Sequence, residues 1–198
     1  MERSLVAISS LKEFFRSLLH QASGHQGIRL GEGTEFYVVN LLSEFAAADK
    51  LFAPDGEGGK EEEALALLRL RALQAPREER IRQLRRLGDV SLYTAGFFGE
   101  ALRERPVGAD YYIRMGGSAY GEVAQLAPTG FSAIYEELGA KFADLVGVLG
   151  EIAARGLVAH GAGGALKVYE TWTRTGSGAL ERVLVDAGWT PTKPGLVN

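Results

Sequence analysis

Residues 88–121 read GDVSLYTAGFFGEALRERPVGADYYIRMGGSAYG, and this stretch decides the fold expected for the chain. Its apolar and aromatic side chains recur at helical spacing, and no period-two alternation typical of a strand persists, so it predicts two helices, about 89–104 and 109–126. Residues 105–107, Arg-Pro-Val, separate the two helices, because the residue before a proline is biased away from helical geometry. The remaining sequence shows the same periodicity and predicts an all-α protein.

Further helices are predicted on both sides of this stretch. A helix over about 34–51 is apolar nearly all round, which is typical of a central, buried helix. Pro76 opens another helix, which Gly88 ends or bends. Residues 53–62 combine proline, glycine and charge and predict a mobile loop, and residues 188–198 form a proline-rich tail. The other predicted helices span about 4–22, 60–74, 130–155, 164–174 and 177–187.

The predicted helix 130–155 carries the clearest apolar stripe. Its members alternate three and four residues apart, so the stripe packs on another helix of the same chain or forms the seam of a homodimer. They are Tyr135, Leu138, Phe142, Leu145, Leu149 and Ile152. Taken together, the pattern predicts a compact single-domain bundle of seven or eight helices over 1–198, with 34–51, 89–104 and 109–126 at its centre.

Composition excludes several classes of function. With 198 residues, 46% hydrophobic and 24% charged, the chain has the balance of one globular domain. It contains no cysteine, which excludes disulfides and thiolate chemistry. A net charge of −3 argues against a nucleic-acid-binding protein. Neither a signal peptide nor a membrane-spanning run is evident, so we expect a cytoplasmic bacterial protein.

Candidate binding residues come mainly from the opening stretch. Gly117 and Gly121 fall on one helical face, which another helix or a flat ligand can approach closely. Acids at Glu35 and Glu44 lie on the apolar second helix and require internal partners if that helix is buried, Arg114 being the natural one. These polar residues are consistent with a structural network, a ligand-binding patch or a metal site. The predicted ligand-binding set is Glu44, Tyr93, Glu100, Tyr112, Arg114, Gly117 and Gly121.

One part of this helix resembles a known family. An aromatic residue and an arginine precede a glycine-rich segment, at Tyr112, Arg114, Gly116, Gly117 and Gly121. This arrangement resembles the distal helix of heme oxygenases. The resemblance implies a haem lying over the glycines, with His20, near the end of the first helix, as the axial metal ligand. The distal aspartate of that family is replaced here by Ser118 or one of its neighbours.

Longer phrases suggest a second resemblance. Residues 35–45 (EFYVVNLLSEF), 88–100 (GDVSLYTAGFFGE) and 110–121 (DYYIRMGGSAYG) are similar to those of an uncharacterised group of bacterial helical proteins. That resemblance spans most of the chain. It implies a single helical domain and no particular activity.

A basic segment supplies the last candidate surface. Arginines are concentrated within residues 69–86. Such a segment is either a solvated helix face or a surface on which an acidic protein partner docks through charge-assisted contacts. The predicted partner-binding residues are Arg77, Arg80, Arg82, Arg85 and Arg86. We therefore expect a non-catalytic binding or protein-interaction module, monomeric or homodimeric. The alternative is a haem-binding protein with His20 as the ligand.

Overall fold

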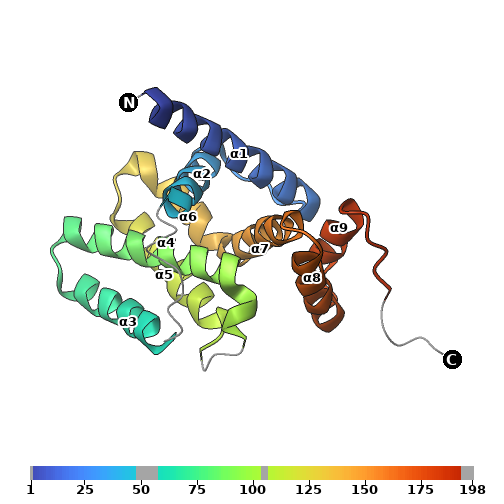
Figure 1. Ribbon diagram of the computed structural model, residues 1–198. Helices are drawn as coiled ribbons and strands as arrows, with labels where there is room; N and C mark the ends of the chain where they lie inside the picture. Colours follow the sequence, from blue (N-terminus) through green and yellow to red (C-terminus); the bar gives the residue numbers. More distant parts are fainter. Residues whose placement is uncertain (1, 48–57, 104–106, 193–198) are drawn as a thin grey trace.

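The described part of the chain is built of α-helices alone. The computed structural model describes residues 2–47, 58–103 and 107–192, and these form nine helices (Figure 1). This confirms the all-α prediction, with nine helices rather than seven or eight. They are α1 (Glu2–Gln26), α2 (Glu32–Ala47), α3 (Gly58–Gln74), α4 (Arg77–Leu102), α5 (Ala109–Leu126), α6 (Thr129–Ala140), α7 (Phe142–Ala159), α8 (Ala162–Thr175) and α9 (Gly178–Asp186).

Helix α4 continues past Gly88, where the sequence predicted an end or a bend. A Cβ atom at Gly88 would lie 2.5 Å from the Tyr120 ring, so this glycine allows α5 to approach α4 closely. Glycine within a helix costs about 1 kcal/mol relative to alanine, and the close contact offsets that cost. The departure from helical geometry comes later, at Phe98 (φ −116°, ψ 16°).

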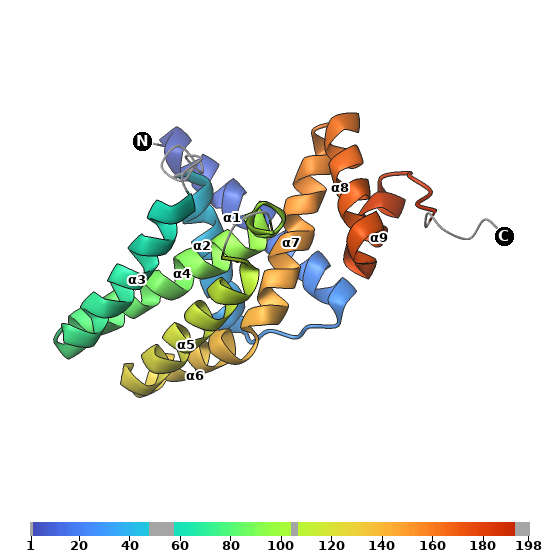
Figure 2. The same cartoon turned by 90° about the horizontal axis from the view of Figure 1, so that it is seen from below.

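The predicted long helix 130–155 is in fact two helices. They meet at Lys141, whose φ of −101° and ψ of 19° are not helical. Helix α6 lies along α5 and touches α2, whereas α7 packs on α4, α1 and α8 (Figure 2). One straight helix could not follow both directions. The apolar stripe is nevertheless buried throughout, which confirms that it packs within the chain: Tyr135, Leu138, Phe142, Leu145, Leu149 and Ile152.

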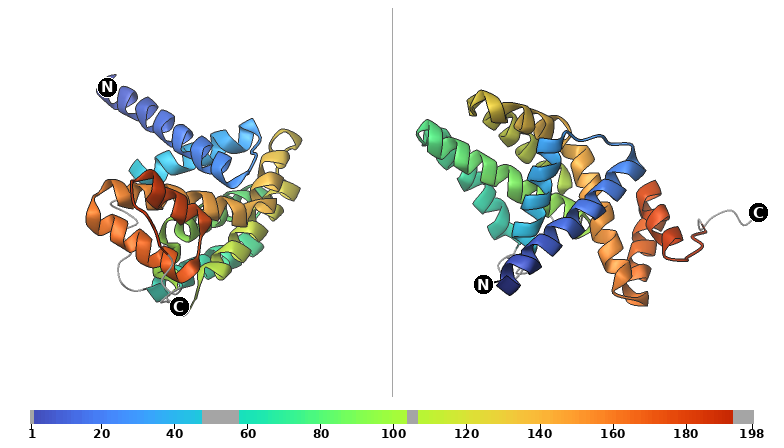
Figure 3. Two further views of the ribbon diagram at one scale, coloured as in Figure 1. Left: turned by 90° about the vertical axis from the view of Figure 1, so that its right-hand side faces the viewer. Right: turned by 90° about the horizontal axis from the view of Figure 1, so that it is seen from above.

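The centre of the bundle is formed by α4, α5 and α7. Helix α1 crosses over α2 and α7 on one side of the molecule (Figure 3), and α3 packs along α4 at an outer edge. Helix α2 lies between α1 and α6 and leaves Phe36 and Glu44 exposed. The prediction that this second helix is central and buried nearly all round is therefore wrong, and α7 takes its place.

The last two helices form a small second core against α7. Trp172 of α8 is 1% exposed there, and the other buried members are Ala154, Val168, Val183 and Leu184. Of the predicted mobile loop 53–62, residues 53–57 lie outside the described part and residues 58–62 begin α3. Within the described ranges, no helix is both long and apolar enough to cross a membrane.

Candidate functional site

A cleft lies where α1 ends and the chain turns toward α2. Gly27 has a left-handed conformation (φ 69°), which suits glycine. The Gly27 N–H donates to the Gly24 carbonyl (3.2 Å), and the Ile28 N–H donates to the Ser23 carbonyl (2.9 Å). These two hydrogen bonds are those of a Schellman cap. The cap directs residues 28–31 back past the last turn of α1 and so creates the cleft.

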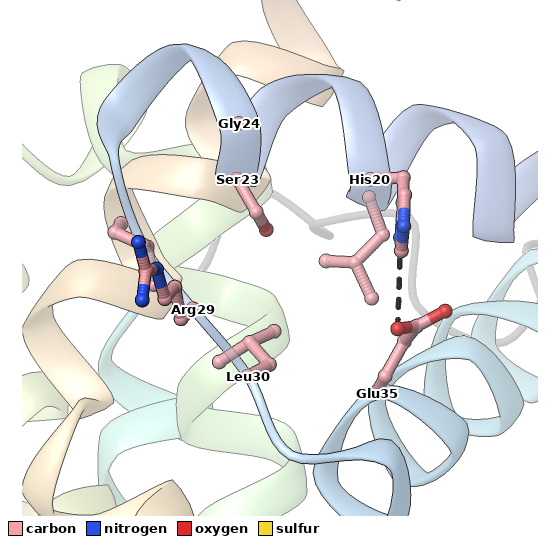
Figure 4. Close-up of a pocket in the computed structure, with 8 residues that line it drawn as sticks. His20, Ser23, Gly24, Arg29, Leu30 and Glu35 are labelled. Carbon is pink, nitrogen blue, oxygen red and sulfur yellow. Dashed lines mark ion pairs between the residues drawn. The ribbon is translucent and has the colours of Figure 1, made fainter.

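The cleft is large enough to take a small molecule. Its volume is about 390 Å³, at the lower end of the roughly 300–1,000 Å³ typical of ligand pockets. Apolar and polar side chains both line it (Figure 4). The apolar residues are Leu19, Ile28 and Leu30, and the others are His20, Ser23, Gly24, Arg29 and Glu35.

Ser23 is the unusual member of this lining. The residue is 7% exposed, and within the described chain its hydroxyl has no hydrogen-bond partner. Figure 4 shows the hydroxyl pointing into the space between Leu30 and the His20–Glu35 pair. A buried, unsatisfied hydroxyl destabilises a fold by about 1–3 kcal/mol, and native proteins retain few such groups.

The charged side of the cleft is Glu35. His20 Nδ1 lies 3.5 Å from Glu35 Oε2, and Arg16 Nε lies 3.7 Å from Glu35 Oε1. Both distances exceed the 2.7–3.2 Å typical of an N–H···O hydrogen bond, so the carboxylate keeps capacity to accept hydrogen bonds. The His20 side chain is 74% exposed and can move without disturbing the core.

The far end of the cleft loop is held by α6. The Gly31 N–H donates to Glu137 (3.0 Å to Oε2), and Lys141 Nζ pairs with Glu137 (2.7 Å) while donating to the Arg29 carbonyl. Partial burial raises the pKa of Glu137, but hydrogen bonds from Lys141, Thr34 and the Gly31 N–H outweigh it and hold that pKa below its ordinary value. Residues 28–31 are thus tied at both ends, and the cleft is preformed.

The aromatic residues predicted to bind a ligand belong to the packed interior. Tyr93 stacks on Phe45 (ring centroids 4.3 Å apart) and on Phe97 (4.8 Å). Tyr112 is fully buried and meets Tyr111 edge to face at 5.7 Å. Offset and edge-to-face pairs of this kind stabilise a core.

The charged residues of the predicted set lie at the surface. Glu44, Glu100 and Arg114 are all exposed, so the prediction that Arg114 is the internal partner of acids on the second helix is wrong. Glu100 pairs instead with Arg174 of α8 and lies 3.4 Å from Arg103. The structure therefore does not gather the predicted set into one pocket.

The glycine face of α5 packs on α6. A Cβ atom at Gly139 would lie 3.2 Å from both the Gly117 carbonyl oxygen and the Gly121 nitrogen. Gly116 is covered by Phe142, whose ring would be 2.2 Å from an added Cβ. Helix α6 thus occupies the face over which a haem would lie in the heme oxygenase resemblance.

His20 lies in the α1–α2 cleft, and its side chain is mostly exposed. The described residues do not fit a haem held between His20 and the glycines, because α6 covers the glycine face. Within the same residues, no group of three or more His, Asp or Glu side chains is placed to hold a metal ion.

Much of the predicted basic face is engaged within the chain. Arg77 donates to the Leu126 carbonyl at the end of α5 (2.8 Å). Arg80 lies 3.2 Å from Glu122, which also pairs with Arg69. The remaining predicted arginines are Arg82, which pairs with Glu79, Arg85, which lies 3.9 Å from Asp89, and the exposed Arg86. Less of this face is free for an acidic partner than the sequence suggested.

A cluster of tyrosines surrounds Asp89 between α2, α4, α5 and α6. Tyr37 and Tyr120 both donate to Asp89 Oδ1, at 2.5 and 2.7 Å, and the Tyr135 ring lies 5.6 Å from that of Tyr37. Burial raises the pKa of Asp89 above its ordinary value and outweighs these hydrogen bonds. Burial likewise raises the pKa of Tyr120, which keeps its hydroxyl a donor.

A fully buried carboxylate, that of Glu151, joins α1, α7 and α9. The Glu151 side chain is 0% exposed, and its Oε1 lies 2.8 Å from His25 Nδ1 and 3.0 Å from Arg155 Nη2. Gln26 Nε2 donates to Oε2 at 2.9 Å. Arg155 also reaches Asp186 of α9 at 2.9 Å. This network ties the second core to the end of α1.

The sequence did not predict the cleft, because the first helix was expected to end at about residue 22, whereas α1 continues to Gln26. The signal was present: Gly27 followed by apolar Ile28 is the pattern of a Schellman cap. The Asp89 cluster was not predicted either, because its tyrosines come from three other helices, α2, α5 and α6. No local pattern reports such long-range contacts.

Comparison of the chain with protein-family models, curated proteins and solved structures finds no match.

Proposed function

We propose that this chain is a non-catalytic binding protein that takes a small ligand in the α1–α2 cleft. The observation that carries the proposal is the Ser23 hydroxyl, which is buried at the cleft without a partner in the described residues. Folding leaves such a group unsatisfied only at a free-energy cost. A ligand hydroxyl, amide or carboxylate would supply the missing hydrogen bond.

The surroundings of Ser23 support binding of a ligand rather than reaction with it. Within the described residues no base contacts the hydroxyl, so nothing is placed to deprotonate it for nucleophilic attack. The loop over 28–31 is fixed by Glu137 and Lys141, so little order has to be imposed when a ligand enters. Preorganisation of this kind increases affinity because less conformational entropy is lost on binding.

The proposal is tested by Ser23→Ala, which should increase the free energy of unfolding and weaken ligand binding. Removing an unsatisfied buried hydroxyl should raise the free energy of unfolding by about 1–3 kcal/mol, measured by urea denaturation. Isoamyl alcohol serves as the probe, with amide proton–nitrogen correlation spectra as the readout. The wild type should show shifts at the amides of residues 19–30, and the variant should need a several-fold higher probe concentration for the same shifts.

Ser17→Ala is the matched control, because Ser17 lies on the same helix with its side chain exposed. Both substitutions gain the helix propensity of alanine, about 0.5 kcal/mol. The increase in the free energy of unfolding of Ser23→Ala beyond that of Ser17→Ala therefore measures the effect of the buried hydroxyl alone. A variant at Ser23 that is less stable than its control would show that the hydroxyl is satisfied inside the fold, and the proposal would lose its support.

A further inference from the structure

Helix α3 carries an exposed apolar face. Its inner face, with Leu65 and Ala72 buried, packs along α4 at the outer edge of the bundle (Figure 2). On the outer face, Leu67, Leu70 and Leu73 are 41%, 51% and 53% exposed. Their spacing of three residues places the leucines along one side of the helix. Two turns of α3 therefore present leucine to the solvent.

This grouping of exposed leucines is peculiar to α3. Among the described residues, every other helix exposes at most one large apolar side chain. Single exposed apolar residues are ordinary at a protein surface, whereas a contiguous apolar patch marks an interaction site. A helix with apolar residues on two opposite faces is typical of a helix that is buried on both sides. The outer face of α3 is accordingly suited to a second helix.

The charges of α3 are divided between its two ends. One lysine and three glutamates occupy residues 60–63, and no acidic residue follows from 64 to 77. Toward the other end, Arg71 and Arg77 are both exposed. Two antiparallel copies of this helix would bring the acidic start of each beside the basic end of the other. Antiparallel pairing also brings the positive end of one helix dipole beside the negative end of the other.

We infer that the outer face of α3 pairs with the same face of a second copy of this chain, antiparallel and about a two-fold axis. Such an interface uses the same patch on both copies, and Leu67 of each copy would face Leu70 of the other. Because α3 lies at the outer edge, the two bundles would lie on opposite sides of the helix pair. One helix pair buries less than a standard interface of roughly 1,600 Å², so the dimer should be weak and concentration-dependent.

Sedimentation velocity over a series of protein concentrations tests this pairing. The wild type should change from monomer to dimer as the concentration rises. Leu70→Glu should weaken association at least about ten-fold, because it would bury an unpaired charge at the centre of the interface. Leu166→Glu is the matched control, because Leu166 is 50% exposed on α8, and it should leave association unchanged. Circular dichroism should show both variants folded, since both leucines are exposed in the single chain.

Single cysteines test the geometry of the pair, because the chain contains no cysteine of its own. Under mild oxidation Leu70→Cys should form a disulfide-linked dimer, because its two copies would lie beside the axis. Leu73→Cys should not, because its copies would be about 13 Å apart along the helices, whereas a disulfide needs Cα atoms within about 7 Å. A wild type that stays monomeric, or a dimer that survives Leu70→Glu, would overturn the inference. Efficient crosslinking of Leu73→Cys would overturn it as well, because it would indicate parallel helices.

Discussion

Two carboxylates inside this bundle are stabilised in different ways. Glu151 is fully buried and is surrounded by Arg155, His25 and the amide of Gln26. Asp89 keeps 21% of its side chain exposed and is held by the neutral hydroxyls of Tyr37 and Tyr120. Both residues join helices that are distant in sequence, but only Glu151 has a cation at hydrogen-bond distance.

The difference between these partners predicts how strongly the stability of the fold depends on the negative charge of each carboxylate. When the Glu151 carboxylate is removed, its charged partner Arg155 loses a counter-ion. A buried charge without a counter-ion strongly destabilises a fold. Hydroxyl partners need only an acceptor, which a neutral amide oxygen also supplies. The stability that Glu151 contributes should therefore depend on its negative charge. The stability that Asp89 contributes should depend on its hydrogen bonds.

The largest effect is expected for Glu151→Gln. Its amide keeps one acceptor oxygen, so its NH2 group would face a donor at one position only, either Gln26 or Arg155. In both orientations the guanidinium of Arg155 would lose its buried counter-charge. We expect the free energy of unfolding to fall by about 3–5 kcal/mol, measured by urea denaturation near neutral pH. The Trp172 fluorescence of the second core should change in the same transition, because Arg155 links Glu151 to α9.

Glu170→Gln is the control for that change, because Glu170 is exposed on α8. It should stay within about 0.5 kcal/mol of the wild type. The double variant Glu151→Leu/Arg155→Leu should recover much of the loss, since apolar residues often replace a buried ion pair at little cost. A loss of less than about 1 kcal/mol in Glu151→Gln would show that the two carboxylates do not differ as proposed.

A smaller loss is expected for Tyr120→Phe. The change keeps the fully buried ring and removes one of the two donors to Asp89 Oδ1. A hydrogen bond to a charged group contributes about 1.5–3 kcal/mol, and Tyr37 remains to hold the carboxylate. Tyr169→Phe is the control by the same urea measurement, because its hydroxyl reaches only an exposed carbonyl, that of Thr192. Equal losses in the two variants would contradict a special role for the Asp89 contact.

The fold was largely predictable, because helical periodicity is local. The apolar stripe of 130–155 was correctly predicted to be buried, yet the break at Lys141 was not, because it follows from packing α6 on α5 and α7 on α4. Gly88 was wrongly predicted to end or bend its helix for the same reason. A glycine in a helical segment either ends the helix or allows another helix to approach closely, and only the position of Tyr120 shows which of the two applies.

The candidate site was less predictable than the fold. Arg77 and Arg80 formed a convincing basic face in the sequence, but their contacts with Leu126 and Glu122 depend on α5 lying antiparallel to α4. The cleft required the Gly27 cap to be recognised and α2 to be placed beside α1. A cap is local and could have been found, whereas the placement of α2 is a long-range property.

The smallest effect is expected for Asp89→Asn, whose amide oxygen can still accept from both tyrosines. Near pH 7 its stability should stay within about 1 kcal/mol of the wild type, because the pair with exposed Arg85 is weak. The folded-state pKa of Asp89 is raised by burial, so the folded protein binds a proton that the unfolded chain releases above its pKa of about 3.9. Urea denaturation from about pH 7 to about pH 4 should therefore show the wild type gaining stability relative to Asp89→Asn as the pH falls. The opposite trend would mean that the tyrosines and Arg85 outweigh burial and that Asp89, like Glu151, depends on its charge.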